Sequence, residues 1–503
     1  MTWAELHDVL RGHGLLVSSP GAAAPVRLAV TGLAYDSRRV EPGDVFVGLR
    51  GQHADGTTFV RQAVQRGAVA VVAQEPPAED VPVAWAQVTD ARVALAALAV
   101  AFHHDPSRRM RVVGITGTNG KTTTGYLVSS IFEAAGIKCG LLGTVAYRTG
   151  KETREATRTT PEAPDVQALL AEMVEQGCGA CVMEVSSHAL ALSRVDGMTF
   201  AAAIFTNLTR DHLDFHADME DYFQAKLRLF QLLPRDNPAV INADDPRAAT
   251  LLQTAGRSIT YGINRPADVT PAALSYSLEG LAFQVRTPRG PLEVRSGLVG
   301  RPNVYNILAA VAVGIALDLP TDAIEQGISS LAAVPGRFQV VSSPNDDVTA
   351  VVDYAHTDDA LKNLLETARP LTTGRIITVF GCGGDRDRTK RPLMGVVAGR
   401  LSDVIFITSD NPRSEDPARI IEEIQRGITQ DTRRSAGQRV VAIVDRHQAI
   451  DAAIEAAVPG DLILIAGTGP EKYQTIGSQT LPFDDVEVAR TALARRRMRQ
   501  GVK

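Results

Sequence analysis

The sequence predicts an α/β protein organised in three domains. Its 503 residues allow about three domains of ordinary size. Apolar runs alternate with amphipathic helical stretches over most of the chain, and the runs are nearly continuous rather than alternating, which is typical of parallel sheets covered on both faces. Composition and turn signals place the domains at residues 1–108, 109–335 and 336–503.

Composition narrows the classes of function. Apolar residues make up 45% of the chain and charged residues 22%, and the net charge of −5 argues against non-specific binding of nucleic acid. Four cysteines do not form a disulfide framework, and Cys178 and Cys181 lack the second pair that a zinc site needs, so buried thiols are favoured over metal or redox use. No signal peptide or membrane segment is recognisable, which predicts a cytoplasmic location.

The first segment reads as short strands, turns and a few helices. A strand is expected at residues 45–47, directly after the turn at residues 41–44, and an Ala-rich helix at residues 91–104. Pro106 follows that helix and marks a plausible domain boundary.

Residues 114–124 carry the strongest functional signal. An apolar strand leads into Gly117-Thr118-Asn119-Gly120-Lys121-Thr122-Thr123, and an apolar helical pattern follows. Glycines allow backbone N–H groups to face a phosphate, Lys121 supplies a charge for the β- and γ-phosphates of ATP, and the Thr122 hydroxyl can ligate Mg²⁺. Ile115 stands where the GxxxxGK[ST] pattern has its first glycine. A plain Gly-rich turn is the alternative, and the strand–loop–helix context together with Lys-Thr disfavours it.

Two polar clusters follow further strands of the central segment. Strands are expected at residues 180–185, 200–205 and 239–242, before a β-like stretch at 258–296 and a helix at 303–317. Glu184 closes the first strand, and His212 follows the second. Mg²⁺ prefers oxygen ligands, so Glu184, the Thr122 hydroxyl and phosphate oxygens suffice for one ion, whereas an ion near His212 would be less typical. Taken singly, either residue could be structural; their positions at strand ends after a phosphate loop favour a site.

The third segment repeats the strand–helix rhythm of a doubly wound sheet. Polar motifs begin at Asp353, Gly381, Asp410 and Gly467, each after a strand, and ligands of such sheets bind at the carboxyl ends of strands. The expected strands are residues 350–353, 375–380, 404–408, 440–444 and 462–466.

These motifs together resemble the Mur ligase and folylpolyglutamate synthase superfamily, and most specifically the Mur ligases. The resemblance rests on Asp36-Ser37-Arg38, the phosphate loop, Thr159-Thr160-Pro161, residues 184–188, residues 210–214, Asp353-Tyr354-Ala355-His356 and Asp410-Asn411-Pro412-Arg413, which occur in the order of the family. It implies an N-terminal domain that binds a UDP-substrate, a central P-loop ATPase domain and a C-terminal Rossmann-like domain that binds an amino acid.

The resemblance also implies an activity. The expected reaction is the ATP-dependent addition of meso-diaminopimelate to the D-Glu of UDP-N-acetylmuramoyl-L-alanyl-D-glutamate through an acyl phosphate, in peptidoglycan biosynthesis, with ATP and Mg²⁺ and by a monomer. Lys121, Glu184, His212 and Lys226 are the implied catalytic residues, with Thr122, Glu184 and His212 at the metal. Lys226 matches a lysine that the family carbamylates, although the sequence alone reads it as an ordinary helix-surface lysine.

The resemblance assigns further contacts position by position. Asn303, Arg337 and Asp353 match residues that contact adenosine or phosphate. Ser37 resembles a uridine-site serine, and Thr159, Thr160, Ser186 and Arg194 resemble contacts to the muramoyl-dipeptide.

The selector for the amino acid is expected at Asp410, Asn411, Pro412 and Arg413. Arg386 and Arg413 could clamp the distal carboxylate of diaminopimelate, and Glu471 would hold its ammonium. Gly467 is also among the residues expected to bind the substrate. Without the resemblance, either arginine would read as a solvated loop residue. Thr468 and Pro470 depart from the Gly-Lys-Gly-His-Glu common in the family, Gln52-His53 inverts the usual order at the uracil contact, and Pro302 replaces an aromatic residue before Asn303.

Three alternatives stay open at this stage. The same ligation could use L-lysine, although two arginines would then leave positive charge unpaired. A folylpolyglutamate synthase-like amide ligase is disfavoured by the selector and by the Asp36-Ser37-Arg38 segment. A regulatory nucleotide-binding protein with a degenerate site is disfavoured because the implied catalytic residues are all intact.

Overall fold

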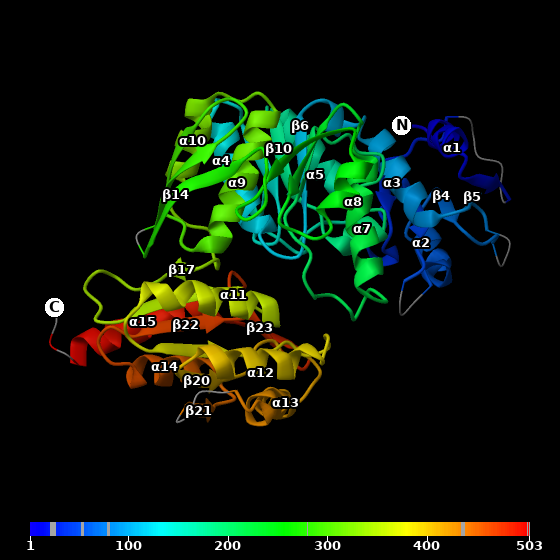
Figure 1. The fold of residues 1–503 in the computed structure, drawn as a ribbon. Helices are drawn as coiled ribbons and strands as arrows, with labels where there is room; N and C mark the ends of the chain where they lie inside the picture. Colours follow the sequence, from blue (N-terminus) through cyan, green and yellow to red (C-terminus); the bar gives the residue numbers. More distant parts are fainter. Residues whose placement is uncertain are drawn as a thin grey trace.

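The structure is a computed structural model that describes residues 1–20, 27–51, 55–77, 81–278, 280–433, 438–499 and 501. Three regions follow one another along the chain, each built on its own sheet: the N-terminal region lies at the right of Figure 1, the central region at the top and the C-terminal region below. The sheets fall within the three ranges expected from the sequence; the domain boundaries themselves stay predictions.

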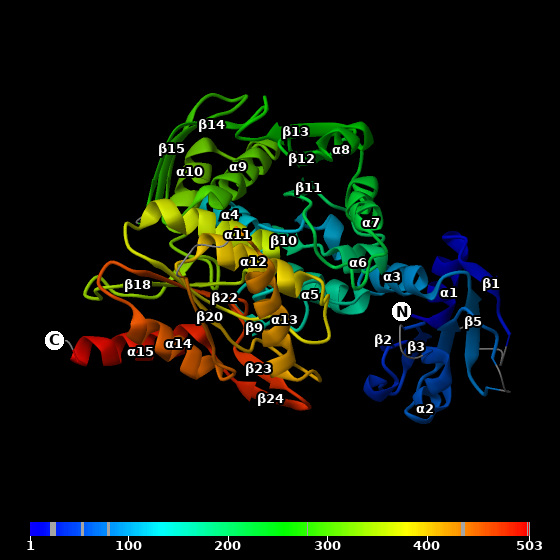
Figure 2. The same ribbon diagram turned by 60° about the horizontal axis from the view of Figure 1, so that its bottom comes forward.

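The N-terminal region is a five-stranded sheet in the order β1-β5-β4-β3-β2, parallel except for β1. Figure 2 shows α3 lying against α5 of the central region. Tyr35 donates a hydrogen bond of 2.5 Å to Asp165 across the same boundary. The elements are β1 (Leu16–Ser18), β2 (Gly32–Ala34), β3 (Asp44–Gly48), β4 (Ala70–Ala73), β5 (Ala84–Val88), α1 (Trp3–Gly12), α2 (Val60–Gln65), α3 (Ala91–Phe102) and the 3₁₀ turns Ser37–Arg39, Gly56–Phe59 and Pro106–Arg108.

The central region contains an eight-stranded sheet in the order β13-β12-β11-β6-β10-β7-β8-β9. The first six strands of this order are parallel, and β8 and β9 continue the edge as antiparallel strands. Because β6 pairs with both β10 and β11, the loops that follow these three strands share one edge. The elements are β6 (Arg111–Thr116), β7 (Cys139–Leu142), β8 (Ala146–Arg148), β9 (Thr153–Glu155), β10 (Ala180–Glu184), β11 (Ala202–Phe205), β12 (Pro238–Asn242), β13 (Arg257–Tyr261), α4 (Lys121–Ala134), α5 (Ala163–Glu175), α6 (Ser187–Ala191), α7 (Met219–Leu232) and α8 (Ala248–Thr254).

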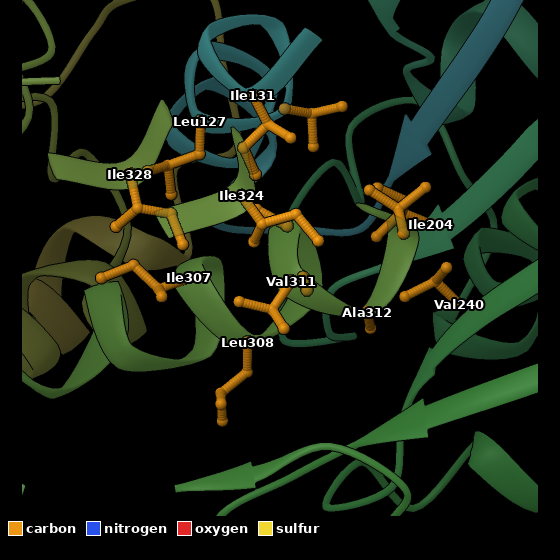
Figure 3. Close-up of a cluster of buried hydrophobic side chains, with 14 of the residues drawn as sticks. Leu127, Ile131, Ile204, Val240, Ile307, Leu308, Val311, Ala312, Ile324 and Ile328 are labelled. Carbon is orange, nitrogen blue, oxygen red and sulfur yellow. The ribbon is translucent and has the colours of Figure 1, made fainter. Parts of the chain in front are cut away.

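The main core lies between this sheet and a covering layer. Side chains of α9 (Arg301–Ala316) contact α4 and the sheet on one side and α10 (Thr321–Ser330) on another (Figure 3). From Val304 onward α9 is buried almost all round, as expected of a helix that is apolar on every face. The layer is completed by the antiparallel strands β14 (Thr270–Ser277), β15 (Gly280–Arg286) and β16 (Leu292–Ser296).

The C-terminal region is a doubly wound sheet in the order β17-β18-β22-β19-β20-β21, parallel except for β17. Helices α11 to α13 pack on one face and α14 and α15 on the other. The elements are β17 (Gln339–Val340), β18 (Thr349–Asp353), β19 (Ile376–Phe380), β20 (Val404–Ile407), β21 (Arg439–Ala442), β22 (Leu462–Ala466), α11 (Asp358–Ala368), the 3₁₀ turn Arg369–Leu371, α12 (Lys390–Leu401), α13 (Pro417–Gln430), α14 (Arg446–Ala456), α15 (Asp485–Arg499) and the hairpin of β23 (Tyr473–Ile476) and β24 (Gln479–Pro482).

The predicted α/β class is confirmed, and the strands and helices expected from the sequence lie within two residues of their predicted ends. The four cysteines are free and buried, as expected of small core side chains. None of the helices in the described ranges is long and apolar enough to cross a membrane.

Candidate active site

The loop after β6 has the backbone of a phosphate cradle. Gly117 and Gly120 have φ angles of +145° and +87°, and a Cβ atom at these positions would lie 1.8 Å from Thr206 and 2.4 Å from Asn306. Only glycine is compatible with both the backbone and the space. Asn207, which follows β11, accepts the N–H of Thr118 on its carbonyl and that of Asn119 on its side-chain amide. The loop is therefore fixed to the end of the neighbouring strand.

Two lysines converge on this loop. Lys121 Nζ donates to the carbonyls of Gly117 and Thr118, at 2.9 and 2.8 Å, and Lys226 Nζ donates to the same Gly117 carbonyl at 2.9 Å. Burial lowers the pKa of Lys121, and burial and then the charge of Lys121 lower that of Lys226 well below its ordinary range.

Lys226 is a buried residue, so its interpretation as a helix-surface lysine is wrong. Its side chain is 1% exposed and its Nζ lies 4.2 Å from the ring centroid of Tyr222, one turn earlier on α7. The signal was present in the sequence: Lys226 falls four residues after Tyr222 and four before Phe230, on the apolar face of the helix.

Glu184 ends β10 with its carboxylate 2% exposed. Its oxygens accept hydrogen bonds from the N–H and the hydroxyl of Thr144, at 2.9 and 3.1 Å. A Cβ at Gly143 would lie 2.4 Å from Glu184 Oε1, so this turn also requires close backbone approach. The carboxylate is thus fixed beside the phosphate loop, with Lys121 near enough to interact with its charge.

His212 lies in the loop after β11 with a left-handed backbone, φ +56°. Burial, partly opposed by Asp211, lowers the pKa of its imidazole to about 3, so the ring is neutral and can act as a ligand. Burial opposes the charge of Asp211, but His212, His356, Lys390 and the His212 backbone N–H together lower the pKa of Asp211 to about 2. Asp211 Oδ2 lies 4.0 Å from His356 Nε2. Asp211 therefore links the central loop to a histidine of the C-terminal region.

The residues of the phosphate site fit a nucleoside triphosphate. In the described parts of the chain, no group of three or more His, Cys, Asp or Glu side chains is placed to hold a metal ion, so Glu184 and His212 are not brought together as a complete protein cage. The donors that do surround the loop are a hydroxyl, a carboxylate and a neutral imidazole. Arg337 donates to Thr122 Oγ1 at 2.9 Å and has a buried Nε without a partner. A guanidinium with an unpaired N–H, in contact with a hydroxyl of the phosphate loop, suits an oxyanion.

The turn that carries Arg337 is held by Asp353 at the end of β18. Asp353 accepts the N–H groups of Phe338 and Ala355, at 2.7 and 2.8 Å, and burial raises its pKa. Asn303 is engaged within α9, where it donates to Val299 and accepts from Asn306. Thr123 is buried in the first turn of α4. Of Asn303, Arg337 and Asp353, Arg337 is the one that donates a hydrogen bond to Thr122 of the phosphate loop.

Four residues expected at the dipeptide form one network beyond β10. The Thr160 hydroxyl donates to the Glu184 carbonyl at 2.9 Å and accepts the N–H of Ser186 at 3.1 Å. Arg194 donates to the Thr160 carbonyl and pairs with Glu162 at 2.8 Å. Thr159 joins the network through the Thr144 hydroxyl, at 3.1 Å. These side chains therefore surround the strand end that carries Glu184.

Ser37 lies in the N-terminal region, outside that network. It is 6% exposed and donates to Gln62 at 2.8 Å. Gln52 and His53, expected near the uracil, lie outside the described residues.

The expected selector is assembled at the carboxyl ends of β20 and β22. Asn411 donates to Glu471 at 2.8 Å and accepts the N–H of Thr475 at 2.7 Å, so it bridges the two loops. Burial and the charge of Asp410 raise the pKa of Glu471 to about 7, although Arg413 and two hydrogen bonds oppose this. Gly467 has a φ of +123°, and a Cβ there would lie 2.5 Å from Asp410.

The two expected clamp arginines differ in how they are held. Arg413, at φ +50° after the buried Pro412, donates to the Gly384 carbonyl at 2.8 Å, and its backbone pairs with Thr475. Arg386 is exposed and donates to the Asp385 carbonyl at 3.1 Å. Both belong to loops at the same sheet edge as Glu471; Arg413 is held by contacts to two other segments, whereas Arg386 is exposed and bonds to its neighbouring residue.

Comparison with known proteins agrees with this arrangement. Three family models match: "Mur ligase family, catalytic domain" at residues 29–103, "Mur ligase middle domain" at 115–314 and "Mur ligase, glutamate ligase domain" at 336–469. The chain is 46% identical over 499 residues to a UDP-N-acetylmuramoyl-L-alanyl-D-glutamate--2,6-diaminopimelate ligase of Geobacter metallireducens, covering 96% of this chain and 97% of the relative. The chain belongs to the Mur ligase family.

Further relatives extend this result. Proteins of the same name from Gloeobacter violaceus and Bacillus licheniformis are 47% and 46% identical, over 93% and 92% of this chain and 95% and 94% of theirs. A solved structure of a ligase of that name is 33% identical, with a TM-score of 0.67 and 99% of both chains covered. The Thermotoga maritima MurF in complex with ADP shares the fold at 19% identity, with a TM-score of 0.62 over 93% of this chain and 99% of that one. The Mur ligase described here is an ATP-dependent enzyme that forms amide bonds.

Sequence reasoning missed several residues that hold the site of this Mur ligase together. Tyr222 contacts the Thr118 hydroxyl at 3.2 Å and lies under Lys226, and Asn119 donates to Asp359 of α11 at 3.0 Å. Arg210 pairs with Asp387 at 3.1 Å. The last two contacts join the central and C-terminal regions, and no local pattern in the sequence announces them.

Proposed function

We propose that this chain adds meso-diaminopimelate to the D-Glu of UDP-N-acetylmuramoyl-L-alanyl-D-glutamate, in peptidoglycan biosynthesis. The names of its relatives supply the substrates. The observation that carries the proposal is that Arg413 and Glu471 lie at one sheet edge, where Asn411, two residues before Arg413, donates to Glu471 and Arg413 donates to the Gly384 carbonyl. A guanidinium and a carboxylate at one sheet edge match the carboxylate and ammonium of the distal head of diaminopimelate.

The phosphate site supports the first step of the reaction. The side carboxylate of D-Glu attacks the γ-phosphate of ATP, giving an acyl phosphate and ADP. Lys121 leaves the Gly117 and Thr118 carbonyls and follows the negative charge, while the N–H groups of the loop hold the phosphates. Arg337, which already contacts Thr122, supplies a second cation from the C-terminal side.

The second step needs the amino acid brought into line. Its amine attacks the carbonyl carbon of the acyl phosphate, a tetrahedral intermediate forms and inorganic phosphate leaves. Glu471 and Asp410 would hold the distal ammonium, and Arg413 and Arg386 the distal carboxylate, which leaves the other amine to react. Thr159, Thr160, Ser186 and Arg194 lie beyond β10, where they would orient the muramoyl-dipeptide.

We propose Thr122, Glu184 and His212 as the groups that hold Mg²⁺. When bound, Mg²⁺ supplies positive charge that neutralises the transferring phosphate. The lowered pKa of His212 keeps its ring neutral over the whole range in which the enzyme would work.

We further propose that Lys226 is carbamylated. Carbamylation requires an unprotonated amine, and the pKa of Lys226 is lowered well below its ordinary range. Reaction of Nζ with CO₂ forms an N–C bond and releases one proton, giving a carbamate anion. That anion would remove the repulsion between Lys226 and Lys121 across the Gly117 carbonyl.

Amino-acid-dependent release of phosphate tests the function. The purified protein is incubated with ATP, Mg²⁺ and the UDP-muramoyl-dipeptide, and with meso-diaminopimelate, L-lysine or L-glutamate in turn. Phosphate release and a UDP-tripeptide are expected with meso-diaminopimelate. A preference for L-lysine would show that the selector has been misinterpreted, and no turnover with any of them would refute the ligase assignment.

We propose that the enzyme acts in the cytoplasm as a monomer.

A further inference from the structure

A buried ion pair lies beneath the selector. Arg446, the first residue of α14, and Asp485, the first residue of α15, are both fully buried. The guanidinium donates to the two carboxylate oxygens through Nε and a terminal nitrogen, at 2.8 and 2.7 Å. A fork-to-fork pair of this kind fixes direction as well as distance. The mechanism proposed above does not use either residue.

Arg446 also reaches both loops of the selector. It donates to the Ala466 carbonyl at 3.0 Å and to the Ser409 carbonyl at 3.5 Å. These carbonyls directly precede Gly467 and Asp410, the first residues of the two loops. A single guanidinium therefore sets the distance between the loops at the point where a Cβ on Gly467 would already touch Asp410.

Thr468 completes the unit. Its hydroxyl contacts Asp485 and accepts from Arg446 at 3.4 Å, and the residue is 2% exposed. This is one of the two positions at which the loop departs from the pattern common in the family. Thr468 belongs to the loop that carries Glu471, and its hydroxyl contacts the ion pair, so it connects that loop to the pair.

We propose that Arg446, Asp485 and Thr468 form a positioning unit that sets the spacing between the Asp410–Arg413 turn and the Gly467–Glu471 loop. By that spacing, the unit determines how strongly the enzyme discriminates between amino acids with and without a distal carboxylate. The inference rests on the proposed function. Its physical basis is that Arg413 and Glu471 belong to different loops, so the fit to a two-charge head depends on the distance between those loops.

The same sheet offers a control at the amino ends of its strands, opposite the selector. Arg375, directly before β19, donates to both carboxylate oxygens of Asp461, directly before β22, through Nε at 3.3 Å and a terminal nitrogen at 2.6 Å; the Asp461 side chain is buried and that of Arg375 is 41% exposed. This pair also ties together segments that flank two strands, but at their amino ends. Weakening either pair should lower the stability of the protein. Only weakening the unit under the selector should change which amino acid the enzyme prefers.

The experiment compares four full-length variants with the wild type: Thr468→Val, Thr468→Ser, Arg446→Lys and Arg375→Lys. For each we measure kcat and KM for meso-diaminopimelate and L-lysine, KM for ATP, and Tm. We define the discrimination ratio as kcat/KM for meso-diaminopimelate divided by kcat/KM for L-lysine. We expect Thr468→Val to raise KM for meso-diaminopimelate by ~10-fold and to lower this ratio, because a small misplacement of a loop weakens a two-point contact. KM for ATP should stay within ~2-fold, since the phosphate loop lies in another region.

The conservative variants separate positioning from general stability. Thr468→Ser keeps the hydroxyl and should restore the wild-type ratio, and Arg375→Lys should lower Tm without changing the ratio. Arg446→Lys should narrow the ratio further; if it does not fold, the Val and Ser pair still decides. An unchanged ratio in folded Thr468→Val, or an equal change in Arg375→Lys, would overturn the inference while wild-type activity upholds the proposed function. A wild type inactive with every amino acid would refute the proposed function, and the inference with it.

Discussion

The phosphate loop and the amino-acid selector lie at the carboxyl edges of two parallel sheets, yet they are held in different ways. Around the phosphate loop, the contacts are made to backbone groups of the loop: Asn207 accepts two loop N–H groups, one on its carbonyl and one on its side-chain amide, and Lys121 and Lys226 both donate to the Gly117 carbonyl. In the selector, side chains bridge two loops, through Asn411 above and Arg446 below. One site is held through the backbone groups of a single loop, and the other by side chains that bridge two loops.

The difference matches what each site has to recognise. The triphosphate has the same structure whichever amino acid is used, so a fixed set of glycine amides and buried cations can bind it. An amino acid differs from its competitors by one charged group, and recognition of that group needs two opposite charges at a set distance. We therefore expect damage to the phosphate site to abolish turnover and damage to the selector to change substrate choice.

The largest effect should come from Lys121→Ala. Loss of a cation that follows charge into the transition state should lower kcat by ~10³-fold or more, while the protein stays folded. Steady-state phosphate release and a thermal melt measure both quantities. The exposed Lys362→Ala is the control and should behave as wild type. Near-normal ligation by folded Lys121→Ala would remove the phosphate site from the comparison.

Lys226→Ala should follow, with kcat lowered by ~10²-fold or more because an anion beside the metal site is lost. Acetate or formate, which can occupy the space of a carbamate, should restore part of the activity. Lys121→Ala should gain nothing from these anions, which makes it the control. A crystal structure with unmodified Lys226, together with an active alanine variant, would contradict carbamylation.

Arg413→Ala tests the other side of the comparison. It should lower kcat/KM for meso-diaminopimelate by ~10²-fold and leave KM for ATP nearly unchanged, because a charge-assisted contact is lost in one region only. Use of L-lysine should change little. The exposed Arg419→Ala on α13 is the control. If Arg413→Ala lowered the use of both amino acids equally, Arg413 would be structural rather than selective.

The smallest effect concerns pH. Burial and Asp410 raise the pKa of Glu471 to about 7, so below that pH the free enzyme holds a neutral carboxyl that no longer attracts an ammonium. We expect kcat/KM for meso-diaminopimelate to fall by about tenfold for each pH unit below 7. Glu471→Gln should be slower and should lose this limb. A wild-type profile flat between pH 5.5 and 7 would show that Glu471 does not bind the amino acid in its charged form.

The sequence predicts the fold and the phosphate loop well because both depend on local patterns. Strand runs, Gly117, Gly120 and Lys121 are set within a few residues of one another, and the structure has the expected strand–loop–helix there. The placement of polar motifs at strand ends is likewise confirmed for Glu184, Asp353 and Gly467.

The rest of the site depends on contacts between distant segments. Asp359 meets Asn119, and Asp387 meets Arg210, only after two regions have folded against each other. The burial of Thr468 could not be inferred either, since its partner Asp485 lies beyond the β23–β24 hairpin, at the start of α15. The roles of the expected contacts to UDP and dipeptide stay predictions.

The covering layer over α9 has a consequence for how the chain is made. Helix α9 is apolar on every face, and Ile324 and Ile328 of α10 close its core against Leu127 and Ile131 of α4 (Figure 3). During synthesis, α4 emerges long before α10, at ~5–20 residues per second. Until α10 leaves the ribosome, the apolar side chains of α4 and α9 that it covers stay exposed. We therefore expect the nascent chain to keep this apolar surface exposed until residues 321–330 have left the ribosome.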